Sequence, residues 1–143
     1  MGKNQTNLSY PTFSKRFFDK YVGKIISDPK IALVELVANS WDAGSTIVQL
    51  KWPKSPDTYF EIVDNGSGMT RDEFEARWNE LTYDRLKVQG STVKIPESSG
   101  NIERKVFGRN GKGRHSLFCF SNKYFVETWK DGFKSKFAVT RTY

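Results

Sequence analysis

Three polar side chains interrupt the otherwise apolar stretch IALVELVANSWDAG, residues 31–44. Glu35, Asn39 and Asp42 stand at positions i, i+4 and i+7, which an α-helix brings into one narrow stripe. A buried carboxylate without a partner is costly, so these groups need partners in the protein or in a ligand. The helix alone leaves two interpretations open: the exposed edge of a partly buried helix, or a functional site.

A second group follows an apolar segment in IVDNGSGM, residues 62–69. Asp64 ends that segment, and Gly66 and Gly68 come directly after it. Two positions without side chains let a ligand approach the backbone closely, and Asp64 could accept a hydrogen bond from an amine of that ligand. An ordinary Asx turn through residues 64–66 is the alternative.

A third group is GRNGKGRHS, residues 108–116, which precedes a predicted helix. Its glycines would expose N–H groups at the positive end of that helix, a suitable place for a phosphate. The segment is not a Walker A loop, because Arg114 and His115 stand where Lys and Ser or Thr are required. It is not a Rossmann fingerprint either, since Ser116 occupies the place of the last glycine.

In this order the three groups, E-x-x-x-N-x-x-D-A-G, D-x-G-x-G and G-x-x-G-x-G, resemble the GHKL ATPases, which have the Bergerat nucleotide-binding fold. That family includes the type II topoisomerase B subunits, the MutL mismatch-repair proteins, the MORC ATPases and the ninety-kilodalton heat-shock chaperones. The resemblance covers residues 28–126, and ELVANSWDAG is most similar to the MutL and MORC branch.

The resemblance implies ATP and Mg²⁺ as ligands and assigns roles to the first two groups. Asp64 would bind the exocyclic amine of adenine, with Gly68 and Met69 shaping the base pocket. Asn39 would bind Mg²⁺ through its amide oxygen, an arrangement that suits an ion with few protein ligands. Glu35 would orient and deprotonate the water that attacks the γ-phosphate.

The third group would form part of a lid over the phosphates, within a lid segment at residues 84–110. Gly108, Gly111 and Gly113 would wrap the phosphates, and Lys112 or Arg114 would neutralise their charge. The implied function is an ATPase module that drives dimerisation or a conformational change in a larger machine, with DNA as one candidate partner.

Other positions carry weaker expectations. Asp42 would support the site rather than touch the nucleotide directly. The threonine of a later strand, which commonly helps to bind adenine in the family, would lie beyond Tyr143. Either the family's last strand is missing or, as we expect, the chain is an N-terminal fragment of a longer protein. The segment TYDRLK, residues 82–87, receives no role. His115, inside the lid motif, is not expected to be a phosphoacceptor.

The elements that must position these residues can be read from the pattern. Residues 1–27 would form an N-terminal arm, in which residues 12–27 have the spacing of an amphipathic helix. Asp28-Pro29 would start a second helix that Gly44 stops. Strands are expected at 46–52 and 59–64, and a capping box at Thr70 and Glu73 starts a helix that runs to about Leu81.

The remainder of the chain completes the expected fold. Residues 84–110 show no periodicity and should form an irregular lid, after which a helix opens near Gly113. Two strands joined by Asp131-Gly132 should close the domain as a hairpin. The order favours an α+β, two-layer sandwich with helices on one face of a mixed sheet.

Size and composition agree with one domain over residues 1–143. The 37% hydrophobic content can supply a core, and Cys119, the single cysteine, should be a buried thiol in a reducing, cytoplasmic or nuclear compartment. No signal peptide or membrane span is expected. The net charge of +7 leaves an alternative function open, a basic module that binds nucleic acid or senses nucleotide without catalysis.

Overall fold

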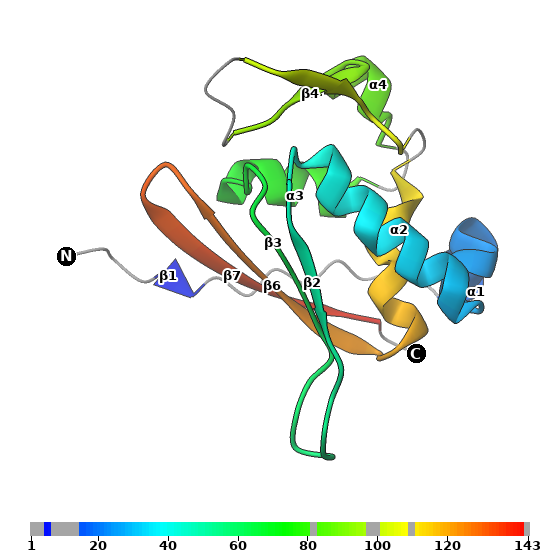
Figure 1. Cartoon of the computed structure of the whole chain (residues 1–143). Coiled ribbons are helices and arrows are strands. Elements are labelled where there is room, and N and C mark those ends of the chain that lie inside the picture. Colours follow the sequence, from blue (N-terminus) through cyan, green and yellow to red (C-terminus); the bar gives the residue numbers. More distant parts are fainter. Residues whose placement is uncertain (1–4, 7–14, 81–82, 97–100, 109–110, 142–143) are drawn as a thin grey trace.

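The structure is a computed structural model that describes residues 5–6, 15–80, 83–96, 101–108 and 111–141 (Figure 1). None of the helices in those ranges is long and apolar enough to cross a membrane. The elements are β1 (Gln5–Thr6), α1 (Lys15–Val22), η1 (Gly23–Ile26), α2 (Pro29–Asp42), β2 (Val48–Lys51), β3 (Glu61–Asp64), α3 (Arg71–Asn79), α4 (Arg85–Gln89), β4 (Thr92–Lys94), β5 (Glu103–Lys105), η2 (Lys112–Cys119), β6 (Lys123–Lys130) and β7 (Phe133–Thr140).

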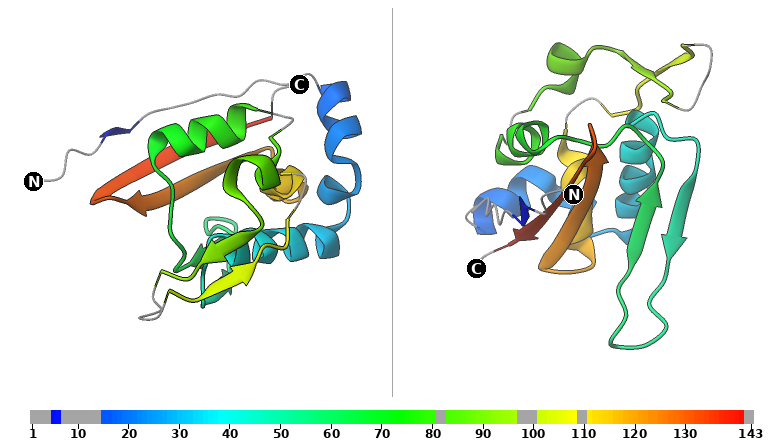
Figure 2. Two further views of the ribbon diagram at one scale, coloured as in Figure 1. Left: turned by 90° about the horizontal axis from the view of Figure 1, so that it is seen from above. Right: turned by 90° about the vertical axis from the view of Figure 1, so that its left-hand side faces the viewer.

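The strands form the sheet side of an α+β sandwich, as the sequence predicts. β7 pairs antiparallel with β6 and parallel with β1, so this three-stranded sheet is mixed. Seen from the left of Figure 1, β2, β3, β6 and β7 stand in front, and α1, α2 and η2 lie behind them (Figure 2, right). Within the described ranges, β2–β3 and β4–β5 form two further pairs that are separate from this sheet. β3 is linked to β6 just past its end, where Met69 N donates to Thr128 Oγ1 at 2.8 Å.

The core lies between the β6–β7 hairpin and the helices behind it. Phe74 of α3 and Phe137 of β7 are buried and stack with ring centroids 3.8 Å apart. Phe118 of η2 packs edge-on against Tyr124 of β6. Val22 of α1 joins the same cluster, so the helices and the hairpin share one hydrophobic core.

Three local signals in the sequence are confirmed. The Asp28 carboxylate caps α2 by accepting from Lys30 N at 2.9 Å, with Pro29 in the first turn. Thr70 and Glu73 form the predicted capping box at the start of α3. Asp131 and Gly132 both have positive φ, 53° and 79°, which gives the β6–β7 turn the twist that a two-residue hairpin needs.

Other boundaries differ from prediction. The single helix expected over 12–27 is two pieces, α1 and η1, because Gly23 has φ 51° and cannot continue an α-helix. Residues 12–14 and Leu81 lie outside the described residues. The helix expected near Gly113 is the 3₁₀ helix η2. Cys119 is only half-buried, so the prediction of a buried thiol is wrong.

The prediction of an irregular segment over 84–110 is also wrong. Asp84 caps α4 through Lys87 N, Gly90 ends that helix with φ 80°, and β4 and β5 pair as an antiparallel hairpin. α4 has five residues and each strand has three, which is too short for a periodic pattern to be recognised in the sequence.

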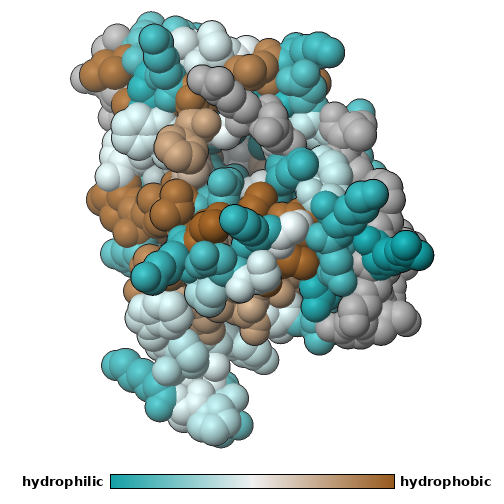
Figure 3. Space-filling model, turned by 90° about the vertical axis from the view of Figure 1, so that its right-hand side faces the viewer, coloured by the Kyte–Doolittle hydropathy of each residue, from teal (hydrophilic) through white to brown (hydrophobic). Residues whose placement is uncertain are grey.

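The side of the molecule that carries α1 and α2 exposes hydrophobic residues between hydrophilic ones (Figure 3). Although residues 31–44 are mostly apolar, Val34, Val37 and Trp41 of α2 are 56%, 41% and 45% exposed. They line an open apolar groove of about 370 Å³, together with Leu33, Ala38 and Phe107.

Candidate functional site

The polar stripe of α2 consists of three residues in three different environments. Asn39 is exposed, Glu35 is half-buried and Asp42 is buried. The exposed-edge interpretation therefore fits Asn39 but is wrong for Asp42. Among the described residues, no group of three His, Cys, Asp or Glu side chains could hold a metal ion, so a cation at this stripe would rely on few protein ligands.

Glu35 lies against the first turn of η2. A Cβ on Gly113 would overlap Oε2 of Glu35, so a side chain at this position would force the Glu35 carboxylate to move. Burial, and then the negative charge of Asp42, raise the pKa of Glu35 above its usual value. The structure thus brings a carboxylate with increased proton affinity to the glycine motif, more than 70 positions away in sequence.

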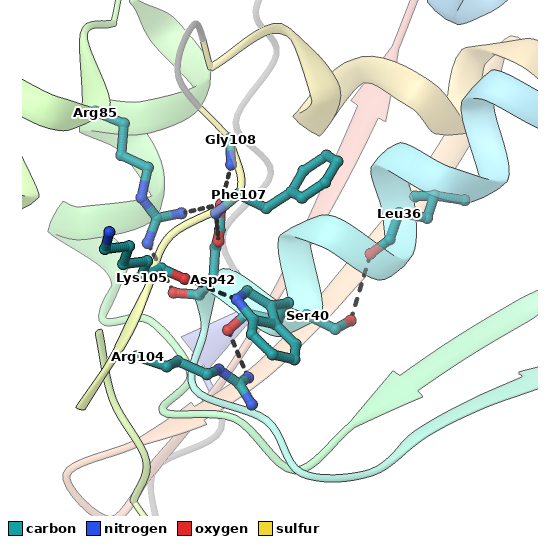
Figure 4. A network of polar contacts seen from close by, with 9 residues as sticks. Leu36, Ser40, Asp42, Arg85, Arg104, Lys105, Phe107 and Gly108 are labelled. Carbon is teal, nitrogen blue, oxygen red and sulfur yellow. Dashed lines mark hydrogen bonds and ion pairs between the residues drawn. The ribbon is translucent and has the colours of Figure 1, made fainter. Parts of the chain in front are cut away.

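Asp42 is at the centre of the most extensive polar network of the site (Figure 4). Its side chain, 2% exposed, accepts from Phe107 N at 2.6 Å and from Gly108 N at 2.8 Å. Arg85 Nη1 lies 2.9 Å from Asp42 Oδ2, and Arg85 Nη2 donates to the Asp42 main-chain carbonyl at 2.7 Å. Asp42 therefore contacts the protein, in keeping with a supporting role. Its partner Arg85 belongs to the segment 82–87, for which no role is predicted from the sequence.

A second arginine attaches the β4–β5 hairpin to the same end of α2. Arg104 donates to the carbonyls of Trp41 and Ser45, both at 2.6 Å, and its guanidinium lies 3.8 Å from the centroid of the Trp41 ring. Trp41 Nε1 donates in return to Lys105 O at 2.9 Å. A cation at the C-terminal end of a helix also interacts favourably with the helix dipole.

Asp64 is exposed at the end of β3 and has two protein partners. Its Oδ1 accepts from Gly66 N at 2.8 Å, the contact of an Asx turn, and its Oδ2 accepts from Ser40 Oγ at 3.0 Å. Each carboxylate oxygen can accept a further hydrogen bond, so the turn and a role in ligand binding are compatible. Ser40 is a buried hydroxyl inside α2, and no motif in the sequence marks it.

The two glycines after Asp64 are required by the protein's own packing. A Cβ on Gly66 would lie 2.7 Å from the Ala43 Cβ, and one on Gly68 would overlap the Trp129 carbonyl. Gly68 also has φ 66°, which disfavours any other residue. The interpretation that these positions are open for a ligand is therefore too simple. Met69 packs against the hydrophobic core.

The glycine motif also contacts the protein. The Gly108 amide is bound to Asp42, and Gly111 has φ 63°, the left-handed conformation that precedes η2. Arg114 is buried and donates to the carbonyls of Gly111 and Glu80. Burial lowers the pKa of Arg114.

The remaining charged groups near the motif also have protein neighbours. Lys112 Nζ lies 4.7 Å from the centroid of the Tyr21 ring. Positions 109 and 110 of the motif lie outside the described residues. His115 is fully buried, and burial followed by the charge of Arg114 lowers its pKa to about 3, so the imidazole is neutral at physiological pH.

Comparison with known proteins identifies the domain. A family model described as "Histidine kinase-, DNA gyrase B-, and HSP90-like ATPase" matches residues 26–143. The chain is 32% identical over 100 residues to the mismatch repair endonuclease pms1 of Dictyostelium discoideum, covering 70% of this chain and 9% of that protein. It is 37% identical over 106 residues to the DNA mismatch repair protein pms1 of Schizosaccharomyces pombe, covering 74% and 12%.

A chaperone is also similar. The chain is 26% identical over 144 residues to the chaperone protein HtpG of Baumannia cicadellinicola, covering 88% of this chain and 22% of that protein. No solved structure matches. The chain spans 9% and 12% of the length of the two mismatch-repair relatives. It belongs to the GHKL family of histidine kinase-, DNA gyrase B- and HSP90-like ATPases, in its MutL-like branch.

Proposed function

We propose that this domain binds ATP with Mg²⁺ and hydrolyses it at the polar stripe of α2. The observation that carries the proposal is the position of Glu35, whose carboxylate lies against Gly113 of the glycine motif. Asn39 is one turn further along α2 and exposed. The side chains that would serve as general base and as Mg²⁺ ligand therefore lie on one helix, and the first of them contacts the glycine motif.

Adenine is proposed to bind at Asp64. Its Oδ2 would accept a hydrogen bond from the exocyclic amine while also accepting from Ser40 Oγ, a contact of 3.0 Å that orients the carboxylate. Gly68 and Met69 would shape the base pocket. The Met69 amide is already bound to Thr128 Oγ1, so this part of the turn is fixed before a ligand binds.

Asn39 fits a Mg²⁺ ion. Mg²⁺ prefers oxygen ligands and retains several waters, so one exposed amide oxygen is a sufficient protein ligand when phosphates supply others. When bound, the ion would neutralise charge on the phosphate oxygens. Lys112 and Gly111 would face the same phosphates, whereas Gly108 and Arg114 are assigned to holding the motif in place because their donors are bound to the protein.

Glu35 would act as the general base. It would orient a water molecule and accept its proton as the water oxygen bonds to the γ-phosphorus. The bond between that phosphorus and the bridging oxygen then breaks, and ADP leaves with the electron pair. A raised pKa makes Glu35 a stronger base than an exposed carboxylate, in keeping with this role.

In the full-length protein, we propose that ATP binding drives dimerisation or a clamp-like movement of a larger machine that acts on DNA. The names of the mismatch-repair relatives support the proposal that the machine acts on DNA. The net charge of +7 and the exposed Trp129 beside Lys134 on the outer face of the hairpin are compatible with contact to nucleic acid. A DNA-binding titration tests this, because phosphate contacts make affinity fall steeply with salt.

The test of the ATPase proposal is Glu35→Ala measured against Asp64→Asn. Glu35→Ala should bind Mg-ATP like the wild type and lose turnover, because only the base is removed. Asp64→Asn should lose nucleotide affinity. Asp72→Asn, an exposed acid in the first turn of α3, serves as the matched control and should change neither quantity. Turnover of Glu35→Ala at the wild-type rate would refute the assignment of the base.

A further inference from the structure

We propose that Arg85 is a positioning residue, which holds the Asp42 carboxylate so that this carboxylate fixes the backbone at Phe107 and Gly108, where the glycine motif begins. The proposal deepens the proposed ATPase function and rests on it. Arg85 is not proposed to contact the nucleotide, and it acts by holding Asp42.

The contact between the two side chains is nearly closed to solvent. Arg85 is 15% exposed and Asp42 is 2% exposed, and their closest atoms, Nη1 and Oδ2, are 2.9 Å apart. The other terminal nitrogen of Arg85 binds the Asp42 main-chain carbonyl at 2.7 Å. One guanidinium therefore fixes both the side chain and the backbone of Asp42, as its planar fork of donors allows.

The same Asp42 carboxylate also holds the chain that enters the glycine motif, and its Oδ2 contacts both Arg85 and Gly108. Oδ1 accepts from Phe107 N at 2.6 Å and Oδ2 from Gly108 N at 2.8 Å (Figure 4). A Cβ on Gly108 would lie 2.9 Å from Oδ2, so the glycine is needed for this close approach. Asp42 uses its whole carboxylate to join Arg85 to these two amides.

This linkage fixes the two ends of the motif to one rigid element. Gly108 is held by Asp42 and Gly113 lies against Glu35, and both acids belong to α2. Without Arg85, the buried Asp42 carboxylate would lack its cationic partner, and an unpaired buried charge strongly favours a rearrangement that exposes it to water. The backbone at Gly108 would then lose its fixed acceptor, and the phosphates would lose a preorganised motif.

The first test is amide hydrogen exchange by NMR. In Arg85→Met, the amides of Phe107 and Gly108 should exchange about tenfold faster than in the wild type, because each loses a hydrogen bond to a fixed charge. The amide of Phe74 in α3 serves as an internal control and should keep its rate. Arg71→Met removes an exposed arginine–carboxylate pair, Arg71 with Glu75, and should leave all three rates unchanged.

The second test compares affinities for Mg-ATP and for adenosine. Arg85→Met should weaken Mg-ATP binding about tenfold while adenosine changes less than about twofold, because only the phosphate side is disturbed. If Arg85→Met does not fold, Arg85→Lys keeps the charge but not the fork of donors, and should shift both measurements in the same direction by less.

The outcomes separate this inference from the function on which it rests. The role of Arg85 would be overturned if Arg85→Met left the amide exchange rates of Phe107 and Gly108 unchanged, or if it weakened the affinities for Mg-ATP and adenosine equally. The proposed function would still stand in that case if the wild-type chain binds Mg-ATP. A wild-type chain that binds no nucleotide would overturn the proposed function and the phosphate part of this inference. The exchange measurement would still decide whether Arg85 fixes the backbone.

Discussion

Replacing Asp42 by alanine should destabilise the domain more than the loss of any surface charge. The wild-type carboxylate is 2% exposed and satisfies a guanidinium and two main-chain amides. Its removal leaves Arg85 as a buried cation without its anion, and two amides without acceptors. Breaking a buried pair in this way costs about 3–5 kcal/mol. Since a domain of this size is stable by about 5–15 kcal/mol, Asp42→Ala should lose a large share of its stability.

Urea denaturation followed by circular dichroism measures this loss directly. Glu127→Ala is the matched control, because Glu127 also binds two cationic side chains, at 3.0 Å each, but is 36% exposed. An exposed ion pair contributes about 0–1 kcal/mol, so the control should lose little. If Asp42→Ala is no less stable than Glu127→Ala, the network around Asp42 does not contribute several kcal/mol to the free energy of unfolding, and this prediction is wrong.

Three further predictions address other parts of the molecule. Glu35→Gln should abolish turnover and raise the free energy of unfolding at pH 7, because a carboxyl whose pKa is raised by folding destabilises the fold when charged; an ATPase assay and a thermal melt check both. His115 has a pKa of about 3 in the fold, so the unfolded chain alone binds its proton between about pH 6.5 and 3. As the pH is lowered through that range, the free energy of unfolding of the wild type should decrease by up to about 1.4 kcal/mol per pH unit more than that of His115→Phe. Equal pH dependence of the two proteins would contradict this. Phe137→Ala should cost about 3–5 kcal/mol in a denaturation curve, since it leaves a cavity against Phe74; a loss below that of Glu127→Ala would contradict the core described here.

The parts of the fold that the sequence predicted are those specified by local chemistry. The Asp28 cap, the Thr70 and Glu73 capping box and the Asp131-Gly132 turn depend on residues within a few positions of one another. Such local signals depend little on how the rest of the chain packs. α4 and the β4–β5 hairpin were missed because their short lengths leave no periodicity, and contacts with the end of α2 hold them in place.

The candidate site shows the same division. The motifs identified Glu35, Asn39 and Asp64, because residue type and spacing are visible in the sequence. Arg85 and Ser40 could not be found, since each acts through a contact with a residue more than 20 positions away. The glycine motifs are visible in the sequence. That these glycines make room for neighbouring parts of the protein is not, because it depends on how β6 and α2 pack.

Calorimetric titration of this chain with ATP, with and without Mg²⁺, tests the proposed nucleotide site directly, and the same titration is repeated on Asp64→Asn. We expect saturable binding of one ATP per chain that is stronger with Mg²⁺ and is lost or greatly weakened in Asp64→Asn. Absence of ATP binding in the wild type, or equal affinity in Asp64→Asn, would contradict a nucleotide site between α2 and the turn that follows β3.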